Sequence, residues 1–515
     1  MRLALTRRCT AVAVVVLLAL STGSANELWF DAQRPSTQAM QALALLADAA
    51  ADGLDPADYD VAGLRRAAAA AARPQAPEAQ RRAFDAALTR ALERFLADLA
   101  RGRVEPRAAG AFYPRPPAPD TAALLRAAAA ADRLPQAVRA AAPALPQYEA
   151  LRRLLADYRA LGAHPAWAQP LPPLPRGRLD PGQPYEGLAQ LAQRLIALGD
   201  LPAGLALPPR YEAVLVEAVR AFQQRHGLAV DGVIGRATRA ELEVDPAQRA
   251  HQIALAMERL RWTPVPQAAR AIVVNLPQFT LHAYAGHDGR GQRALERPVI
   301  VGGATPARSR TPLFAAELRY LEFSPFWDVP RSIVEHDLGP RLRRDPQAFE
   351  REGFEFVTGD GRLVRQFDQA LLAAVLRGQA RMRQRPGPAN AMGQIKFALP
   401  NPFVIYLHDT PDTALFERVR RDLSHGCIRV RDPLALAAFV LAAEPEWDEA
   451  RIVAAMTRDR PTTARLRAPV PVLIEYRTAV AVEGRPHFYP DFYGLDRVLT
   501  RALGRSPAIG DTTAR

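Results

Sequence analysis

The amino-acid pattern changes near Ala271, and this change divides the chain into a helical part and a β-rich part. Before it, apolar residues recur at helical spacing, as at Phe84, Leu88 and Leu92. After it come short runs rich in β-branched residues, of which 272–275 is the first. A chain of 515 residues has room for roughly three domains. The sequence therefore predicts a multidomain α+β protein.

We expect five segments. The limits of the first four follow from changes in pattern and from breaks rich in proline or glycine, whereas the last is implied by a resemblance given below. They are a removable leader (1–25), an α-helical scaffold domain (26–180), a compact three-helix unit (181–245), a β-rich domain (265–480) and a C-terminal extension (481–515). Inside the β-rich domain, the stretch 332–395 is polar and more helical, which predicts an insertion over the site. A strand is expected over 404–408.

Residues 1–25 have the parts of a secretory signal peptide. Arg2, Arg7 and Arg8 supply the charged start, 11–20 form an apolar core, and small residues follow. A core of about 10 residues is short for a membrane span, which needs about 20. The alternative is an uncleaved anchor, and only in that case do we expect the protein to contact a membrane. Under either hypothesis the rest of the chain is exported.

The net charge of +13 first suggests a nucleic-acid partner. However, all but one of the 67 basic residues are arginine, the exception being Lys396, and alanine and proline are abundant. This composition indicates a bias of the genome rather than a binding surface. Since the sequence has no long run of basic residues and no nucleic-acid motif, we expect no nucleic-acid partner. A weak attraction to an anionic polymer, such as a cell wall, remains open.

The chain has two cysteines, and only Cys427 lies outside the expected leader, because the other is Cys9. An exported protein with one cysteine has no internal disulfide partner, so a reactive thiolate explains the residue better than a structural role. Cys427 ends the run Ser424-His425-Gly426-Cys427. This predicts a cysteine acyltransferase or hydrolase. The alternative is an inert, buried cysteine.

A cysteine nucleophile needs a base, because a free thiol is mostly protonated at neutral pH. His425 lies two positions before Cys427, where its ring is not certain to reach the sulfur. His408 arrives from a separate strand, so we expect it to be the base and later the acid. We expect Asp409 to orient the His408 ring, through its side chain or its backbone.

The remaining residues of the motif predict supporting roles. The backbone amides of Gly426 and Cys427 are candidate donors to an oxyanion. Ser424 is expected to hold His425, and Arg429 to bind a carboxylate. A zinc site formed by the two histidines and the cysteine is the weaker hypothesis, because no fourth ligand is evident. We therefore expect no metal and no organic cofactor.

The three-helix unit resembles a known family. The run 218–224, followed by Gly227-Leu228 and by 231–238, is similar to the three-helix peptidoglycan-binding domain. The resemblance implies binding to peptidoglycan. The alternative is a helical bundle that serves only as a spacer.

The site resembles the L,D-transpeptidase catalytic domain. That family has a histidine, 14 to 17 further residues and then Ser/Thr-His-Gly-Cys, and here 409–423 separate His408 from Ser424. The segments 275–279, 299–303, 326–330 and 386–393 look like the large periplasmic subgroup of Gram-negative bacteria. The resemblance implies a helical scaffold, a β-rich catalytic domain with a capping insertion, and a location in the periplasm.

By that resemblance, Cys427 attacks the carbonyl of the third residue of a tetrapeptide stem, and the terminal D-alanine leaves. The amine of a diamino acid on a second stem then resolves the thioester, which gives a 3→3 cross-link. His408 would be the base, while Trp327 and Tyr406 would shape the substrate cleft. The expected partner is peptidoglycan, as donor and as acceptor, and other cell-wall synthesis proteins are candidates.

Three alternatives stay open. The same site would act as an L,D-carboxypeptidase if water resolved the thioester. It would attach proteins to the wall if the acceptor were a protein. An inactive wall-binding scaffold is the alternative from a different class, and the intact histidine and cysteine speak against it.

Overall fold

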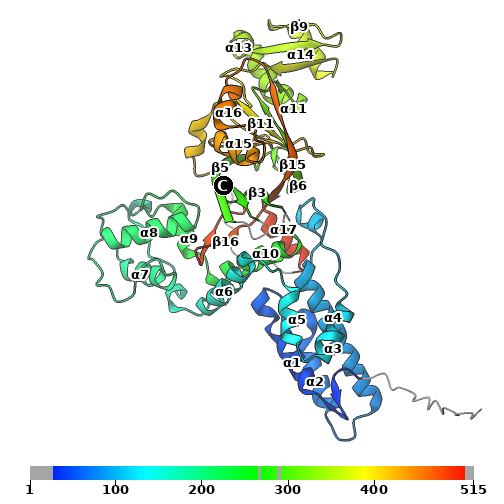
Figure 1. The fold of residues 1–515 in the computed structure, drawn as a ribbon. Helices are drawn as coiled ribbons and strands as arrows, with labels where there is room; N and C mark the ends of the chain where they lie inside the picture. Colours follow the sequence, from blue (N-terminus) through cyan, green and yellow to red (C-terminus); the bar gives the residue numbers. More distant parts are fainter. Residues whose placement is uncertain (1–26, 265–267, 287–291, 505–515) are drawn as a thin grey trace, which may run out of the picture.

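The computed structural model describes residues 27–264, 268–286 and 292–504, so the expected leader with Cys9 lies outside the described residues. Figure 1 shows a helical scaffold at one end, a three-helix unit to one side, and a β-rich body with a separate layer above it. Long apolar helices of the kind that cross a membrane do not occur in the described ranges. The predicted fold class, an α+β multidomain protein, is confirmed.

The scaffold is a bundle whose core is closed by a helix from later in the chain. Its helices are α1 (Thr37–Ala47), α2 (Val61–Ala71), α3 (Glu78–Arg101), α4 (Thr121–Ala130), α5 (Leu134–Ala141), α6 (Pro146–Leu161) and α10 (Pro246–Trp262). The expected stripe on α3, including Phe84 and Leu88, is buried in this core. Ile253 and Met257 of α10 are buried in the same core. The chain therefore returns to the scaffold after the three-helix unit.

The three-helix unit contains α7 (Leu188–Ala197), α8 (Ala213–Arg225) and α9 (Arg236–Glu243) around a core of its own. It is attached to the C-terminal extension, which forms the hairpin β16 (Ala479–Val482) and β17 (Arg485–Phe488) and the helix α17 (Leu495–Ala502). The buried Arg225 donates to the carbonyl of Pro486 at 2.8 Å and pairs with Asp200. Arg485 of β17 also pairs with the buried Asp200 at 2.7 Å, so a hydrogen bond and an ion pair hold the unit and the extension together.

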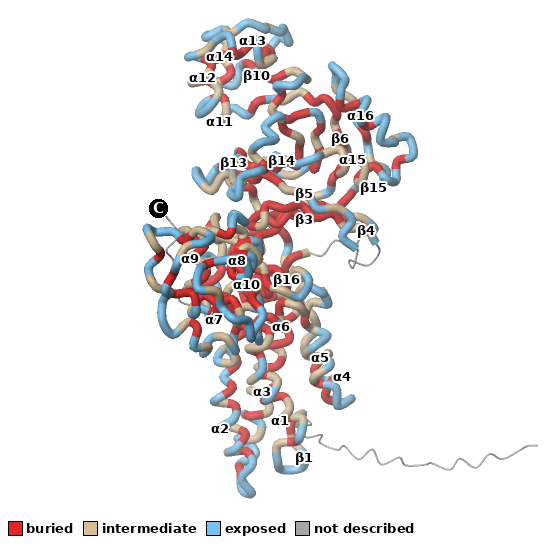
Figure 2. The backbone as a smooth tube through the Cα atoms, turned by 90° about the vertical axis from the view of Figure 1, so that its left-hand side faces the viewer, coloured by how far each residue is buried: buried red, intermediate tan, exposed pale blue. Residues whose placement is uncertain are grey.

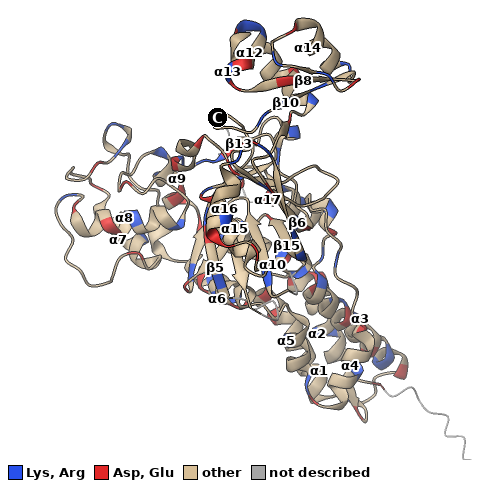
Figure 3. Cartoon of the chain, turned by 45° about the horizontal axis from the view of Figure 1, so that its top comes forward, with Lys and Arg blue, Asp and Glu red and all other residues tan. Residues whose placement is uncertain are grey.

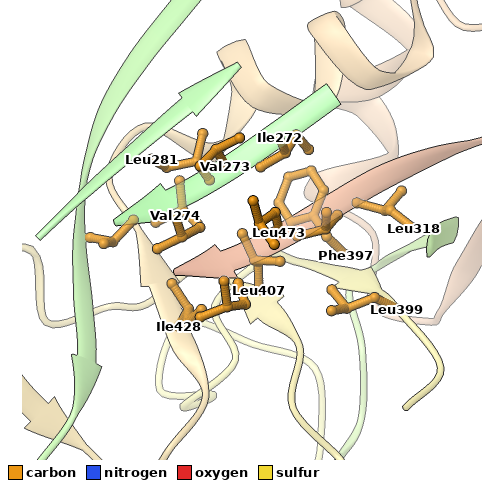
Figure 4. Close-up of a cluster of buried hydrophobic side chains, with 14 of the residues drawn as sticks. Ile272, Val273, Val274, Leu281, Leu318, Phe397, Leu399, Leu407, Ile428 and Leu473 are labelled. Atoms are coloured by element: carbon orange, nitrogen blue, oxygen red, sulfur yellow. The ribbon is translucent and has the colours of Figure 1, made fainter. Parts of the chain in front are cut away.

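The β-rich domain has a nine-stranded sheet of order β13-β5-β14-β12-β11-β6-β15-β3-β4, and β4 also pairs with β5, so the sheet closes on itself. Its strands are β3 (Arg270–Asn275), β4 (Thr280–Ala285), β5 (Gln292–Gly302), β6 (Ala315–Phe323), β11 (Ile395–Ala398), β12 (Leu407–His408), β13 (Asp422–Ser424), β14 (Ile428–Val430) and β15 (Thr462–Glu475). Figure 4 shows the apolar side chains that fill it. Helices α15 (Pro433–Leu441) and α16 (Glu449–Met456) follow the motif.

The strand expected over 404–408 is shorter than predicted, since only Leu407 and His408 pair with neighbours. The preceding residues form a loop around Asn401, whose side-chain oxygen accepts from the backbone amides of Phe403 and Ile405. Side-chain hydrogen bonds of this kind replace ladder bonds, so the apolar run becomes a loop.

The insertion has strands as well as helices, which differs from the mainly helical expectation. Its four-stranded sheet has the order β7-β10-β8-β9, formed by β7 (Trp327–Asp328), β8 (Phe354–Thr358), β9 (Leu363–Val364) and β10 (Ala380–Gln384). Its helices are α11 (Arg331–Ile333), the π-helix Val334–Leu338, α12 (Gly339–Arg344), α13 (Gln347–Arg351) and α14 (Gln369–Leu376). Phe349, Phe356 and Leu372 form a separate core. We call 327–384 the cap; Figure 2 shows it above the main sheet, with exposed outer helices.

Candidate functional site

Two neighbouring parallel strands, β12 and β14, bring His408 and Cys427 together. The amide of Ile428 donates to the carbonyl of Tyr406 at 3.0 Å, and His408 lies opposite Arg429. Since side chains alternate along a strand, Tyr406, His408, Cys427 and Arg429 share one face. Leu407 and Ile428 point the other way into the core. Strand register thus joins groups that lie 19 positions apart in the sequence.

The His408 imidazole is held in its neutral form. Its Nδ1 lies 2.5 Å from the carbonyl oxygen of Asp409, which only accepts, so Nδ1 carries the proton and Nε2 a lone pair. Burial lowers the pKa of His408 to about 3, and the charge of Arg429 adds to this effect, while backbone hydrogen bonds oppose it. The ring is therefore uncharged at neutral pH and free to accept a proton.

Asp409 orients this ring through its backbone. Its carboxylate points elsewhere and accepts from the amide of Gln394 at 2.9 Å. Gly393 permits this approach, because a Cβ there would lie 2.3 Å from a carboxylate oxygen, and its φ of +61° also favours glycine. Of the two routes that the sequence left open, the structure has the backbone route.

Burial raises the pKa of the Cys427 thiol, so the resting sulfur is protonated. Hydrogen bonds from the backbone and side chain of Tyr406 favour the thiolate, as do the nearby charges of Lys396 and Arg429. Burial also raises the pKa of Tyr406, so its hydroxyl keeps its proton and donates to the sulfur, while the side chain of Trp327 bonds to the same hydroxyl. Trp327 lies on β7, so this chain of contacts leads from the cap to the sulfur.

Ser424 stabilises the turn that carries the cysteine. Its hydroxyl donates to the carbonyl of Cys427 at 2.6 Å and accepts from the amide of Gly426 at 3.1 Å. The expected contact between Ser424 and His425 is therefore replaced by contacts inside the turn. The Gly426 amide is already engaged, whereas the Cys427 amide has no partner among the described residues. Of the two expected oxyanion donors, the Cys427 amide is the available one.

Gly426 itself is required by the shape of this turn. Its φ is +124°, which side chains rarely adopt, and a Cβ there would lie 3.1 Å from Ile405.

His425 faces the cap rather than the sulfur. Its Nε2 lies 2.5 Å from an oxygen of Asp337 on the π-helix of the cap, and both side chains are about half exposed. The motif is thus in contact with the insertion that covers it. The sequence provided no signal for Asp337.

Arg429 lies on the site face with free donor capacity. One terminal nitrogen lies 3.1 Å from Asp412, but its Nε is buried without a partner among the described residues. The other terminal nitrogen, Nη2, has no hydrogen-bond partner among the described residues and is the donor that an incoming carboxylate could use. The expected contact with a substrate carboxylate is compatible with this geometry.

Metal ligation has no support within the described ranges, where no group of three or more His, Cys, Asp or Glu side chains could hold an ion.

Basic and acidic residues are interspersed over every part of the fold, as Figure 3 shows. Lys396 also lies at the site, and reasoning from the motif alone missed it.

Three family models match the chain. Residues 24–155 match the "Scaffold domain", 185–242 the "Putative peptidoglycan binding domain" and 269–472 the "L,D-transpeptidase catalytic domain". A curated "Putative L,D-transpeptidase" from Haemophilus influenzae is 34% identical over 248 residues, which are 48% of this chain and 49% of that protein. The chain thus spans about half the length of that relative.

Solved structures show a more distant likeness. An L,D-transpeptidase from Xylanimonas cellulosilytica is 18% identical and covers 59% of this chain and 100% of its own, with a TM-score of 0.18. An L,D-transpeptidase from Stackebrandtia nassauensis is 12% identical and covers 57% of this chain and 94% of its own, with a TM-score of 0.22.

Proposed function

Because the chain carries the catalytic domain of the L,D-transpeptidase family and a domain of the peptidoglycan-binding family, we propose that it forms 3→3 cross-links between the stem peptides of peptidoglycan. The supporting observation is the shared face of Cys427 and His408, with the Nε2 lone pair of the base available. We also propose that the protein is exported to the periplasm, on the strength of the leader pattern.

In the first half-reaction, Nε2 of His408 takes the thiol proton of Cys427 as the sulfur attacks the carbonyl carbon of the third stem residue. The amide of Cys427 donates to the oxyanion. The imidazolium then returns the proton to the amine as the C–N bond breaks. D-alanine leaves, and the stem remains as a thioester.

In the second half-reaction, the side-chain amine of a diamino acid on another stem attacks the thioester. His408 accepts the proton of that amine and returns it to the departing sulfur, so the thiol is regenerated. Arg429 is suited to hold a stem carboxylate during both steps, because its Nη2 has no hydrogen-bond partner among the described residues.

The decisive measurement is mass spectrometry of the products after incubation of the mature protein with a disaccharide-tetrapeptide. A cross-linked dimer that has lost one D-alanine is the expected result. A tripeptide monomer alone would show that water resolves the thioester, which is the carboxypeptidase reaction. An unchanged substrate would contradict both enzymatic functions.

A further inference from the structure

Lys396 is the only lysine in a chain with 67 basic residues, and it lies beside the proposed base. Strand β11 places it directly opposite His408 on one side and opposite Glu322 on the other. Since partners in register share a face, Glu322, Lys396, His408 and Arg429 form one row across four adjacent strands. The one basic residue that is not an arginine thus lies in the same row as His408 and Arg429.

The lysine ammonium is held in place by two contacts. Its Nζ lies 3.3 Å from Glu322 Oε2 and 5.0 Å from the centre of the Tyr406 ring. Both contacts favour a cation, and the second is a cation–π interaction. Tyr406 in turn bonds to the sulfur of Cys427 and lies edge-on to the His408 ring at 5.8 Å. The ammonium is therefore linked to both reacting groups through one aromatic ring.

An arginine is a poor substitute at this position. Its guanidinium is a broad, planar fork, whereas an ammonium is a compact point charge that fits between a carboxylate and a ring face. In this chain arginine occupies every other basic position, so the lysine indicates a requirement that arginine does not meet.

We propose that Lys396 is a positioning residue for the transfer reaction. Its ammonium orients Tyr406 against the sulfur and, through its charge, favours the Cys427 thiolate and the neutral form of His408. The role rests on the proposed cysteine chemistry, and it is tested by a readout that needs no peptidoglycan.

The test is the pH dependence of Cys427 alkylation by iodoacetamide, which reports the thiolate directly. Lys396→Met keeps the length of the side chain and removes the charge. We expect its alkylation midpoint to rise by roughly one pH unit, and its rate at neutral pH to fall about tenfold. Lys396→Arg keeps the charge, so its midpoint should move less, while its acylation by a stem donor should still be impaired.

Arg465→Met is the matched control, because Arg465 also lies over a tyrosine ring, that of Tyr320, but on an exposed strand position away from the sulfur. Its alkylation profile should equal that of the wild type. An unchanged midpoint in Lys396→Met would overturn the proposal. A Lys396→Arg variant with both the wild-type alkylation profile and the wild-type acylation rate would also overturn it.

The lone lysine permits a second test on the otherwise unaltered protein. Reductive methylation with ¹³C-formaldehyde labels Lys396 and the chain's amino terminus. The Lys396 resonance should shift with pH as Cys427 ionises, and this inflection should be absent in Cys427→Ala. An identical titration in both proteins would contradict the coupling. If the wild type alkylates normally yet forms no cross-links, the transpeptidase function fails while the role of Lys396 is still measured.

A separate observation concerns a cleft of about 490 Å³ between the three-helix unit and the catalytic domain. Its walls are 227–231, the hairpin turn 277–279, the loop 417–421 and the pair Tyr489-Pro490. Val230 and Val419, on opposite walls, are among the exposed large apolar side chains. Arg418 is exposed and forms no ion pair within the described residues.

We infer that this junction cleft holds a peptidoglycan strand whose stem enters the catalytic site. Both walls come from domains whose families act on or bind this polymer. Apolar and aromatic side chains suit the faces of sugar rings, and arginine suits stem carboxylates. The loop 417–421, on one wall of the cleft, leads along the chain directly into β13 and the cysteine turn. This inference rests on the proposed function.

The test compares retention on purified sacculi with turnover of the soluble disaccharide-tetrapeptide. Val230→Asp combined with Val419→Asp should weaken retention about tenfold, and it should lower turnover of the short soluble fragment by a smaller factor, because that fragment spans less of the cleft. Val453→Asp, an exposed valine on α16, is the matched control. If sacculi retain the double variant as well as the wild type, the inference that this cleft holds a peptidoglycan strand is overturned. If the wild type turns over no soluble substrate, the proposed transpeptidase function fails. The retention comparison still shows whether the cleft binds peptidoglycan.

Discussion

Cys427, His408 and Lys396 belong to the nine-stranded sheet, whereas Trp327 and Asp337 face them from the cap, a separate layer with a separate core. The sheet side is fixed by strand register and burial. The contact from Asp337 is a single ion pair between half-exposed side chains. Since exposed ion pairs contribute little free energy, the sheet holds the chemistry in place while the cap is only weakly tied to the motif.

The largest loss of activity is expected on the sheet side, when the thiol of Cys427 is removed. Cys427→Ala should lower turnover by at least about a thousandfold, because the nucleophile is lost, while thermal unfolding stays close to the wild type. A carbapenem should acylate the wild type at Cys427 and leave this variant unmodified, as read by intact-protein mass spectrometry. An adduct at another residue would contradict the nucleophile assignment.

The second largest effect on activity is expected at His408, the proposed base. His408→Asn should lower acylation by roughly a hundredfold or more, since proton transfer is lost. In the wild type, the pKa of about 3 keeps His408 neutral down to about pH 4, and the raised thiol pKa keeps Cys427 protonated through neutral pH. The competent thiol–imidazole state therefore dominates between these limits. Acylation should be nearly flat from about pH 5 to pH 8, and an acid limb near pH 6.5 would argue against a buried, neutral base.

Tyr406 connects the two sides, because its hydroxyl bonds both to Cys427 and to Trp327 of the cap. Tyr406→Phe removes the donor to the thiolate, so alkylation of Cys427 should require a higher pH, and acylation should fall about tenfold. Trp327→Phe should produce a smaller change in the same direction. If Tyr406→Phe and Trp327→Phe lowered acylation equally, the cap would contribute as much to the reactivity of Cys427 as the sheet does.

The smallest effect is expected at the ion pair between the cap and the motif. Asp337→Asn should change kcat/KM by about twofold to fivefold, since both partners are half exposed. Asp345→Asn is the control, because its ion pair with Arg351 is also half exposed and lies entirely within the cap. A loss in Asp337→Asn as large as that of the His408 variant would reverse the comparison between sheet and cap.

Local patterns predicted the helical scaffold, the three-helix unit and the start of the β-rich domain. The helical stripe of α3 and the three helices of the small unit follow from residue periodicity, and the first β-branched run, 272–275, lies in β3. The strand before His408 was predicted too long, because the side chain of Asn401 competes for backbone amides. The strands of the cap were missed, since polar residues and breaks obscured their alternation.

At the site, the spacing of the motif singled out Cys427 and His408 but not the contacts of their neighbours. Ser424 was expected to hold His425, and it instead bonds to the turn around Gly426. His425 contacts a cap residue 88 positions earlier in the sequence. Contacts of this kind depend on which segments fold against each other, and no local pattern encodes them.

The amino-acid order alone was sufficient for the fold class, for the division into helical and β-rich parts, and for choosing Cys427 and His408 as the expected nucleophile and base, because periodicity and motif spacing are local properties. Only the folded chain decided the rest. Strand register joined Glu322, Lys396 and His408 into one row, and α10 returned to complete the scaffold. Burial then made His408 a neutral base and Cys427 a protonated thiol, since the loss of water around a group, not its place in the sequence, sets its charge.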